Sequence, residues 1–132
     1  MIVADDGFLR GVRYIASPNC DQRPSGSTVE LLVIHNISLP PGEFGGPGIV
    51  ELFTNRLNPD AHPYYREIAG HAVSSHFLIR RDGELIQFVP CAKRAWHAGE
   101  SNWRGRSHCN DFTLGIELER SEERRVGKEC RL

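Results

Sequence analysis

The stretch VELLVIHN, Val29 to Asn36, decides the fold. Its centre, Leu31 to Ile34, is a continuous apolar run, which is typical of a strand covered on both faces. We therefore predict a central strand with helices packed against its sheet. His35 ends this run, directly before a loop rich in proline and glycine.

A loop, a helix and a second loop are predicted after this strand. Ser38 to Gly48 holds prolines and glycines that exclude both a helix and a ladder strand. In IVELFTNRLN the apolar residues recur at helical spacing, which predicts an amphipathic helix of about three turns. These residues are Ile49, Leu52, Phe53 and Leu57. PDAHPYYREIAGHA has little periodicity and is predicted to be a loop.

A β-hairpin is predicted for VSSHFLIRRDGELIQFVP, because Asp82-Gly83 is a strong turn signal between two β-rich arms. GVRYI, Gly11 to Ile15, is a short strand candidate. The turn-forming stretch SPNCDQRPSGST and the later stretch KRAWHAGESNWRGRSHCN are predicted to be loops.

The last predicted strand is DFTLGIELE, Asp111 to Glu119. Leu114, Ile116 and Leu118 share one side of it and are predicted to be buried, while Glu117 points to the other side. These elements predict a single domain with a mixed central sheet and at least one covering helix, in an α/β or α+β layer arrangement.

Composition excludes several classes of protein. The net charge is −1, so no basic field favours nucleic acid or an anionic membrane as a partner. No apolar run approaches the ~20 residues that cross a bilayer. The start, MIVADDGFLRG, carries acids where a secretory signal carries basic and apolar residues, and the scattered cysteines form no C-x-x-C pair. We therefore expect a cytoplasmic protein with reduced thiols.

His35 is the first candidate for chemistry. It lies at the end of the predicted buried strand, where ligands and substrates commonly bind. A rigid strand end also suits a metal ligand. The alternative is a histidine that caps the sheet through a backbone hydrogen bond.

Glu117 is the second candidate. If the sheet is covered on both sides, its carboxylate lies in apolar surroundings that raise its pKa, as a general acid or base requires. The alternative is an exposed charge on an edge strand.

AWHAG, Ala95 to Gly99, places an indole beside an imidazole in a loop. Trp96 offers an apolar wall with an N–H donor for a sugar or peptide, or else it plugs the core. The remaining histidines have simpler interpretations: His76 is a satisfied core residue, and those in loops are solvated. The loop histidines are His62, His71 and His108.

Several stretches together resemble one family, the 1,6-anhydro-N-acetylmuramoyl-L-alanine amidases of bacterial peptidoglycan recycling. They are SPNCDQRP, LLVIHNISLPPGEFGG, SSHFLIRRDGELIQFVP, KRAWHAG and CNDFTLGIELE. This family is a branch of a zinc amidase superfamily that includes phage amidases and peptidoglycan recognition proteins. The resemblance implies a mixed sheet flanked by helices, with Zn²⁺ in a groove and an anhydro-muropeptide as substrate.

Site residues follow from the same resemblance. His35 matches the first zinc ligand, and Glu117 matches the carboxylate that acts as general base on the zinc-bound water. Asn36, Trp96 and His97 fall in stretches that line the groove and are expected to bind substrate. We expect a monomer with no nucleic-acid or membrane partner.

The sequence departs from the family after residue 119. The family's second and third zinc ligands, a histidine and an aspartate, lie in a later segment that resembles G-H-x-D-I-A-P-x-R-K-x-D-P-G. No such segment follows Glu119. We therefore expect residues 1–119 to form the N-terminal two-thirds of an amidase domain that is incomplete at its C-terminus, with two zinc ligands missing and no activity. The alternatives are a metal-independent muropeptide-binding module and a piece that does not fold stably.

The tail has a separate interpretation. RSEERRVGKEC, Arg120 to Cys130, matches codon for codon the translation of a widely used sequencing adapter. We expect residues 120–132 to be a non-native tail, and such a segment is excluded from fold reasoning. A natural charged tail and a genuine truncated paralogue are the alternatives.

Overall fold

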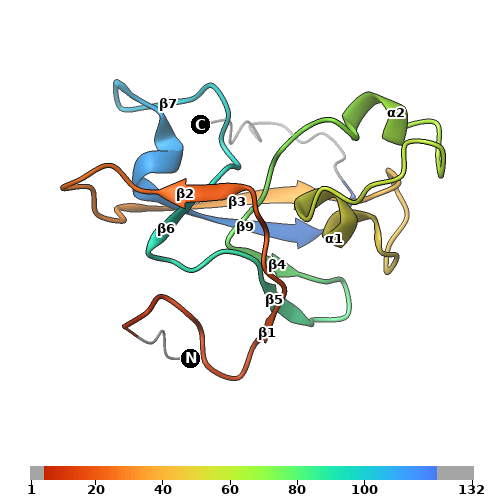
Figure 1. Ribbon diagram of the computed structural model, residues 1–132, viewed down its shortest axis with the longest axis horizontal. Coiled ribbons are helices and arrows are strands. Elements are labelled where there is room, and N and C mark those ends of the chain that lie inside the picture. Colours follow the sequence, from red (N-terminus) through yellow and green to blue (C-terminus); the bar gives the residue numbers. More distant parts are fainter. Residues whose placement is uncertain (1–4, 122–132) are drawn as a thin grey trace.

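A five-stranded mixed sheet forms the centre of the protein in a computed structural model that describes residues 5–121 (Figure 1). The strand order is β1-β5-β4-β9-β3, with β4 and β5 antiparallel and the other neighbours parallel. In chain order these strands are β1 (Arg13–Tyr14), β3 (Leu31–Ile37), β4 (Phe77–Ile79), β5 (Leu85–Gln87) and β9 (Thr113–Glu119). The α/β arrangement around a mixed sheet is as predicted.

Smaller elements complete the fold. The helical ones are α1 (Gly48–Phe53), α2 (Tyr65–Ile68) and the 3₁₀ helix η1 (Cys109–Phe112). Two antiparallel pairs are formed by β2 (Cys20–Gln22) with β6 (Lys93–Ala95), and by β7 (Asn102–Trp103) with β8 (Arg106–Ser107). The segments 17–28, 59–72 and 93–110 were predicted to be plain loops, and that prediction was wrong for these short elements.

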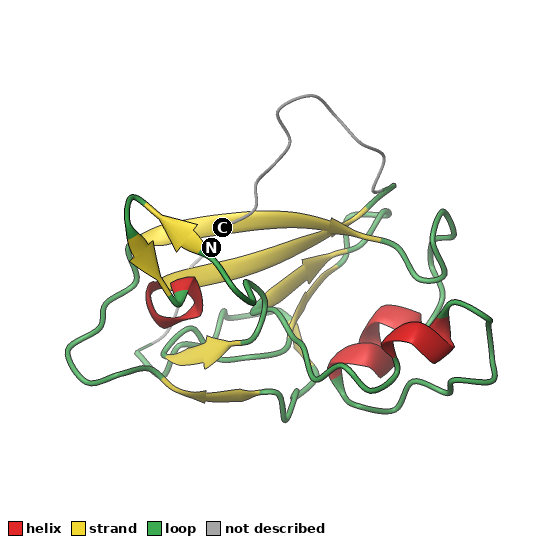
Figure 2. Cartoon of the chain, turned by 90° about the horizontal axis from the view of Figure 1, so that it is seen from above, coloured by secondary structure: helices red, strands yellow, loops and turns green. Residues whose placement is uncertain are grey.

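One face of the central sheet carries the second layer. Figure 2 shows α1, α2 and the β2–β6 pair on the same side of the long strands. The buried core lies between these layers and joins Leu78 of β4 and Ile86 of β5 to Phe53 of α1 and Ala95 of β6. Because α1 and β6 meet the sheet from one side, this covered face is where enclosed side chains gather.

The predicted helix is real but shorter than three turns. α1 has six residues and ends at Phe53. Asn55 stops it by adopting a left-handed backbone with φ of 60°. Its amide group exchanges hydrogen bonds with the side chain of Asn19, at 2.9 Å in both directions, which holds the turn in place. Leu57 still enters the core, but from the segment after the helix.

The predicted hairpin is confirmed. β4 and β5 pair antiparallel, with Leu78 opposite Ile86. The turn between them contains Asp82 and Gly83, and Gly83 has a φ of 94°. A glycine adopts this left-handed conformation at little cost, which is why Asp-Gly is a good turn signal.

The prediction that Leu31–Ile34 is covered on both faces was wrong. β3 pairs only with β9 within residues 5–121, so it is an edge strand there. Val33 faces the covered side and is 3% exposed, whereas Leu32 is 53% and Ile34 46% exposed. The apolar run therefore reflects one buried face and one face without a covering layer in the described part of the chain.

β9 reverses the predicted burial of its two faces. Leu114, Ile116 and Leu118 were predicted to be buried, but they are only half-buried. The fully buried side is the polar one, which includes Glu117 and Glu119. The apolar side of β9 continues the open face of β3, because both strands lie at the same end of the sheet and residues 5–121 form no second layer on that side.

Glu119 shows how the polar face is satisfied. Its side chain is 1% exposed and forms an ion pair of 3.3 Å with Arg80. It also accepts the backbone N–H of Gly45 at 2.8 Å and that of Arg81 at 3.2 Å. A buried charge costs stability unless it is paired and hydrogen-bonded in this way. These bonds fix the proline-rich loop against the β4–β5 hairpin.

Of the helices within residues 5–121, none has the length and apolar character that crossing a membrane requires.

A matched pair of leucine truncations tests the asymmetry of the sheet. Leu78→Ala removes a side chain that is 0% exposed, so we expect it to lower the free energy of unfolding by about 2–5 kcal/mol. Leu32→Ala alters the open face and is expected to cost about 0.5 kcal/mol or less. Urea unfolding followed by circular dichroism measures both. Similar losses from the two variants would mean that the Leu32 face is covered in solution.

Candidate active site

The parallel pairing of β3 and β9 places the two predicted catalytic residues side by side. His35 and Glu117 are register partners, and Glu117 is also the partner of Leu78 in β4. In-register residues of neighbouring strands point to the same face, so both side chains lie on the covered side of the sheet. Glu117 is 9% exposed, and His35 is half-buried. The structure thus brings an imidazole and a buried carboxylate together.

His97 joins this pair from the segment after β6. Its Nδ1 lies 3.1 Å from Nε2 of His35, and the two rings meet edge to face. Burial lowers the pKa of both imidazoles, that of His97 to about 3, to which the neighbouring His35 and His76 also contribute. Both rings are therefore neutral at physiological pH, which is the form that binds metals.

Gly115 explains how His97 can lie against the sheet. A Cβ at position 115 would come within 2.6 Å of the His97 ring, a distance that real Cβ atoms do not reach. The hydroxyl of Thr113 then meets Nε2 of the ring at 2.9 Å. The side-chain oxygen of Asn110 accepts the backbone N–H groups of His97 and Ala98 at 3.1 and 2.9 Å. Strand, ring and loop are thus fixed together.

His76 is the satisfied core residue that the sequence suggested. Its Nδ1 accepts the backbone N–H of Gly115 at 3.0 Å, so its Nε2–H donates to the carbonyl of Lys93 at 2.8 Å. Burial and the nearby Arg23 charge lower its pKa to about 4, although the bond to the Lys93 carbonyl opposes them. Both ring nitrogens are used in holding β4, β9 and β6 together. His76 therefore has a structural role.

Arg23 fixes the approach to β9 through backbone carbonyls. Its guanidinium donates to the carbonyls of Cys91 at 3.0 Å, Asn110 at 3.2 Å, Asp111 at 3.1 Å and Thr113 at 2.9 Å. Burial lowers its pKa from the ordinary arginine value. The planar fork of an arginine can serve this many acceptors at once.

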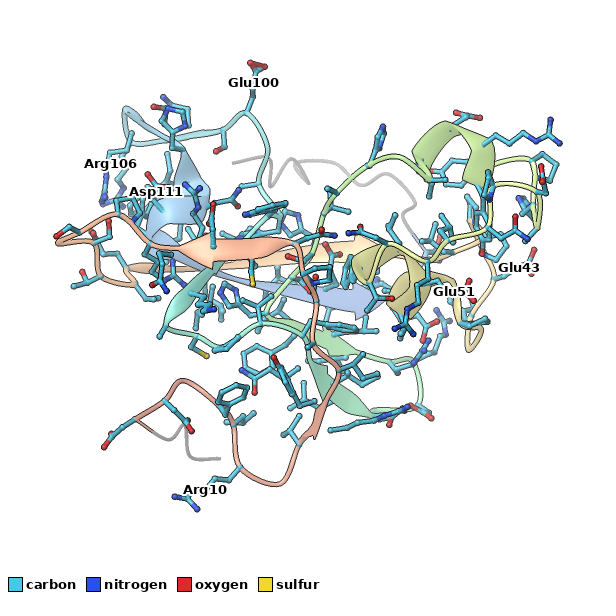
Figure 3. The ribbon with its side chains drawn as sticks, in the orientation of Figure 1. Arg10, Glu43, Glu51, Glu100, Arg106 and Asp111 are labelled. Atoms are coloured by element: carbon cyan, nitrogen blue, oxygen red, sulfur yellow. The ribbon has the colours of Figure 1, made fainter. Side chains whose placement is uncertain are left out.

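A second arginine ties η1 to the small sheet. Arg94 of β6 forms ion pairs with Asp21 of β2 at 2.6 Å and with Asp111 of η1 at 2.5 Å. These bonds raise the pKa of Arg94, and Arg94 lowers the pKa of Asp21. Figure 3 places Asp111 at this end of the molecule, near Arg106, whereas Glu100 projects away from the body. The network holds the segment that leads into β9.

The other predicted substrate residues are less central. Trp96 is half-buried: its carbonyl accepts the backbone N–H of Ser74 and its own N–H donates to the Ser74 hydroxyl. Its indole also contributes to lowering the pKa of Asp21. Asn36 is exposed and, by the alternation of β3, lies on the opposite face from His35. The loop histidines stay outside the cluster: His71 and His108 are exposed, and His62 is half-buried beside Tyr65.

Three residues of this site were not predicted from the sequence: Thr113, Gly115 and Asn110. One signal was present, because a glycine inside a strand often marks a close approach of another group. Nothing in the local pattern indicated that His97 is the group that approaches.

The described donors fit one position of a zinc site. A half-buried neutral imidazole such as His35 is a common zinc ligand. However, residues 5–121 hold no group of three or more His, Cys, Asp and Glu side chains arranged for a metal. The predicted tail, residues 120–132, lies outside them except for Arg120 and Ser121.

Comparison of the chain with known protein families identifies its class. The sequence profile of the N-acetylmuramoyl-L-alanine amidases matches residues 25–129. The chain therefore belongs to the N-acetylmuramoyl-L-alanine amidase family.

Several similar proteins are 1,6-anhydro-N-acetylmuramyl-L-alanine amidases by name. The chain is 59% identical over 118 residues to the 1,6-anhydro-N-acetylmuramyl-L-alanine amidase AmpD of Salmonella typhimurium strain SL1344, covering 89% of this chain and 63% of the relative. It is 58% identical to the Escherichia coli K12 protein of the same name, covering 89% and 64%. A crystal structure of an AmpD derivative superposes with a TM-score of 0.87 at 57% identity, covering 90% of this chain and 66% of that one. The chain thus spans slightly less than two thirds of these relatives.

The depressed pKa of His76 predicts an acid-sensitive fold. Its pKa lies near 4 in the folded state and near 6.5 in the unfolded state. Between these values the unfolded chain binds more protons, so the free energy of unfolding falls as the pH is lowered from about 6.5 to 4. We expect His76→Gln to reduce this slope by up to about 1.4 kcal/mol per pH unit, the value for one proton.

The measurement is urea unfolding at several pH values across that window. Exposed His71 gives the matched control, because His71→Gln is expected to leave the slope unchanged. The slope is read instead of the absolute stability, since His76→Gln also breaks two hydrogen bonds. Equal slopes for the wild type and His76→Gln would contradict the assignment.

Proposed function

We propose that this chain supplies the catalytic strands of a zinc-dependent hydrolase. The bond it acts on is the amide between 1,6-anhydro-N-acetylmuramic acid and L-alanine, in bacterial peptidoglycan recycling. One observation carries the proposal: His35 and Glu117 are register partners on the covered face of the sheet, in a chain of this amidase family. The names of the relatives support the choice of substrate.

The proposed roles follow from the geometry. His35 holds one position of the zinc site, and when bound the metal supplies an acidified water and polarises the amide carbonyl. Glu117 takes a proton on a carboxylate oxygen and returns it to the leaving amine. Its burial on the strand face keeps that carboxylate away from bulk water, which strengthens its interaction with a nearby charge.

Substrate binding is proposed for the segment after β6 and the end of β3. His97 and Trp96 reach the covered face by way of backbone bonds that fix their loop. Asn36 is proposed to contact substrate at the rim of the sheet. We further propose a cytoplasmic monomer that uses neither nucleic acid nor a membrane as partner, which the near-neutral net charge supports.

We propose that residues 1–119 are the N-terminal two-thirds of the amidase domain and that residues 120–132 are not native to it. With one zinc position among the described residues, the 132-residue chain is expected to show no cleavage of anhydro-muropeptide in added Zn²⁺. A chimera tests the remainder: residues 1–119 joined to the corresponding C-terminal part of the Escherichia coli relative are expected to cleave the substrate.

Within the chimera, Glu117→Gln is expected to reduce turnover by about 10²–10⁴-fold, the usual contribution of a general acid–base group. Glu100→Gln, at a side chain that projects from the body, is the control and is expected to have no effect. Product release followed by chromatography gives the rates. A chimera that folds but does not cleave would sink the proposed function, and turnover by the 132-residue chain itself would show a complete ligand set.

A second candidate is a metal-independent muropeptide-binding module. It is favoured by the direct contact between His35 and His97, which closes part of the site without metal. Calorimetric titration of the 132-residue chain with anhydro-muropeptide in EDTA separates the two. The amidase proposal expects no measurable heat of binding, whereas binding that chelation leaves unchanged would favour the module.

A further inference from the structure

A relay of hydrogen bonds runs from the start of β9 to His35. The hydroxyl of Thr113 lies 2.9 Å from Nε2 of His97, and Nδ1 of His97 lies 3.1 Å from Nε2 of His35. Thr113 is 0% exposed, and the ring of His97 rests on Gly115. Neither group can turn away without leaving a buried polar atom unpaired, which costs about 1–3 kcal/mol.

The available donors and acceptors determine which atom donates in each hydrogen bond of the relay. Within residues 5–121 the hydroxyl of Thr113 has no second partner, so its proton is used only if it donates to Nε2 of His97. A neutral imidazole with an accepting Nε2 carries its proton on Nδ1. That proton is then donated to Nε2 of His35, which leaves the proton of His35 on its own Nδ1.

We propose that His97 is a positioning residue for His35: it engages Nε2, fixes the ring, and leaves Nδ1 as the nitrogen that is open to a ligand. Nδ1 of His35 has no hydrogen-bond partner in the described part of the chain. That this ligand is a metal ion rests on the proposed function, whereas the positioning does not.

Ring nitrogen shifts of the ¹⁵N-labelled 132-residue chain test the inference without an activity assay. Above neutral pH and without metal, we expect long-range ¹H–¹⁵N spectra to show His35 and His97 both protonated on Nδ1. Protonation of either ring on Nε2 in the metal-free chain would overturn the inferred direction of the relay.

Three substitutions separate positioning from simple packing. His97→Asn keeps an amide near the place of Nδ1, His97→Gln keeps one near Nε2, and His97→Phe fills the space without a polar atom. We expect the Asn variant to retain the His35 tautomer, because its amide can still donate to Nε2 of His35. The Gln and Phe variants are expected to lose that tautomer preference.

Gly115→Ala gives an independent route, because its Cβ displaces the ring of His97 without replacing any residue of the relay. Gly46→Ala, where the added Cβ meets nothing within 4 Å, is its control. Amide spectra show whether each variant is folded. If folded His97→Phe or Gly115→Ala leaves the His35 ring shifts unchanged, His97 does not position His35. Failure of the chimera to cleave muropeptide would leave these shifts unaffected, so the two proposals fail separately.

Discussion

The in-register parallel pairing of β3 with β9 is the constraint on which this structure depends. Seven consecutive residue pairs join the two strands, from Leu31 with Thr113 to Ile37 with Glu119. Because side chains alternate between faces, a slip of one residue would move either His35 or Glu117 to the open side. The same register places Gly115 beside Val33, where the missing side chain makes room for an imidazole. The sheet register therefore places His35 and Glu117 on one face and leaves room there for the ring of His97.

Much of this architecture could be predicted from local patterns. The apolar run at 31–34 and the alternation at 113–119 identified the two long strands, and Asp82-Gly83 identified the hairpin. What the patterns could not supply was which face a second layer covers. Alternation in β9 suggested that its leucine side is buried, but the layer formed by α1 and β6 lies on the glutamate side. Which face is covered depends on packing between distant segments, so the sequence of a single strand does not indicate it.

The residues of the site likewise divide into those that local patterns predicted and those that they could not. His35 and Glu117 were found because each belongs to a strand whose pattern is clear. The contact of His97 with His35 spans 62 positions and depends on a loop that returns over the sheet, held by Asn110 and Thr113. Local spacing cannot report such a contact. Gly115 was the available hint, since a glycine in a strand interior weakens the strand unless another group occupies the space.

The contacts of Arg23 have a consequence for how this domain can vary. Four of its partners, from Cys91 to Thr113, are backbone carbonyls, and its guanidinium also lies 3.3 Å from Nε2 of His76. A backbone acceptor is present whatever side chain the residue carries, so substitutions at Cys91 or Asn110 leave that anchorage intact. Position 23 has no such freedom, because lysine offers a single ammonium in place of the planar fork. Positions around the entrance to β9 therefore differ in the substitutions that they tolerate. Arg23 cannot be replaced by lysine without losing these bonds, whereas Cys91 and Asn110 accept them through backbone carbonyls that any residue provides.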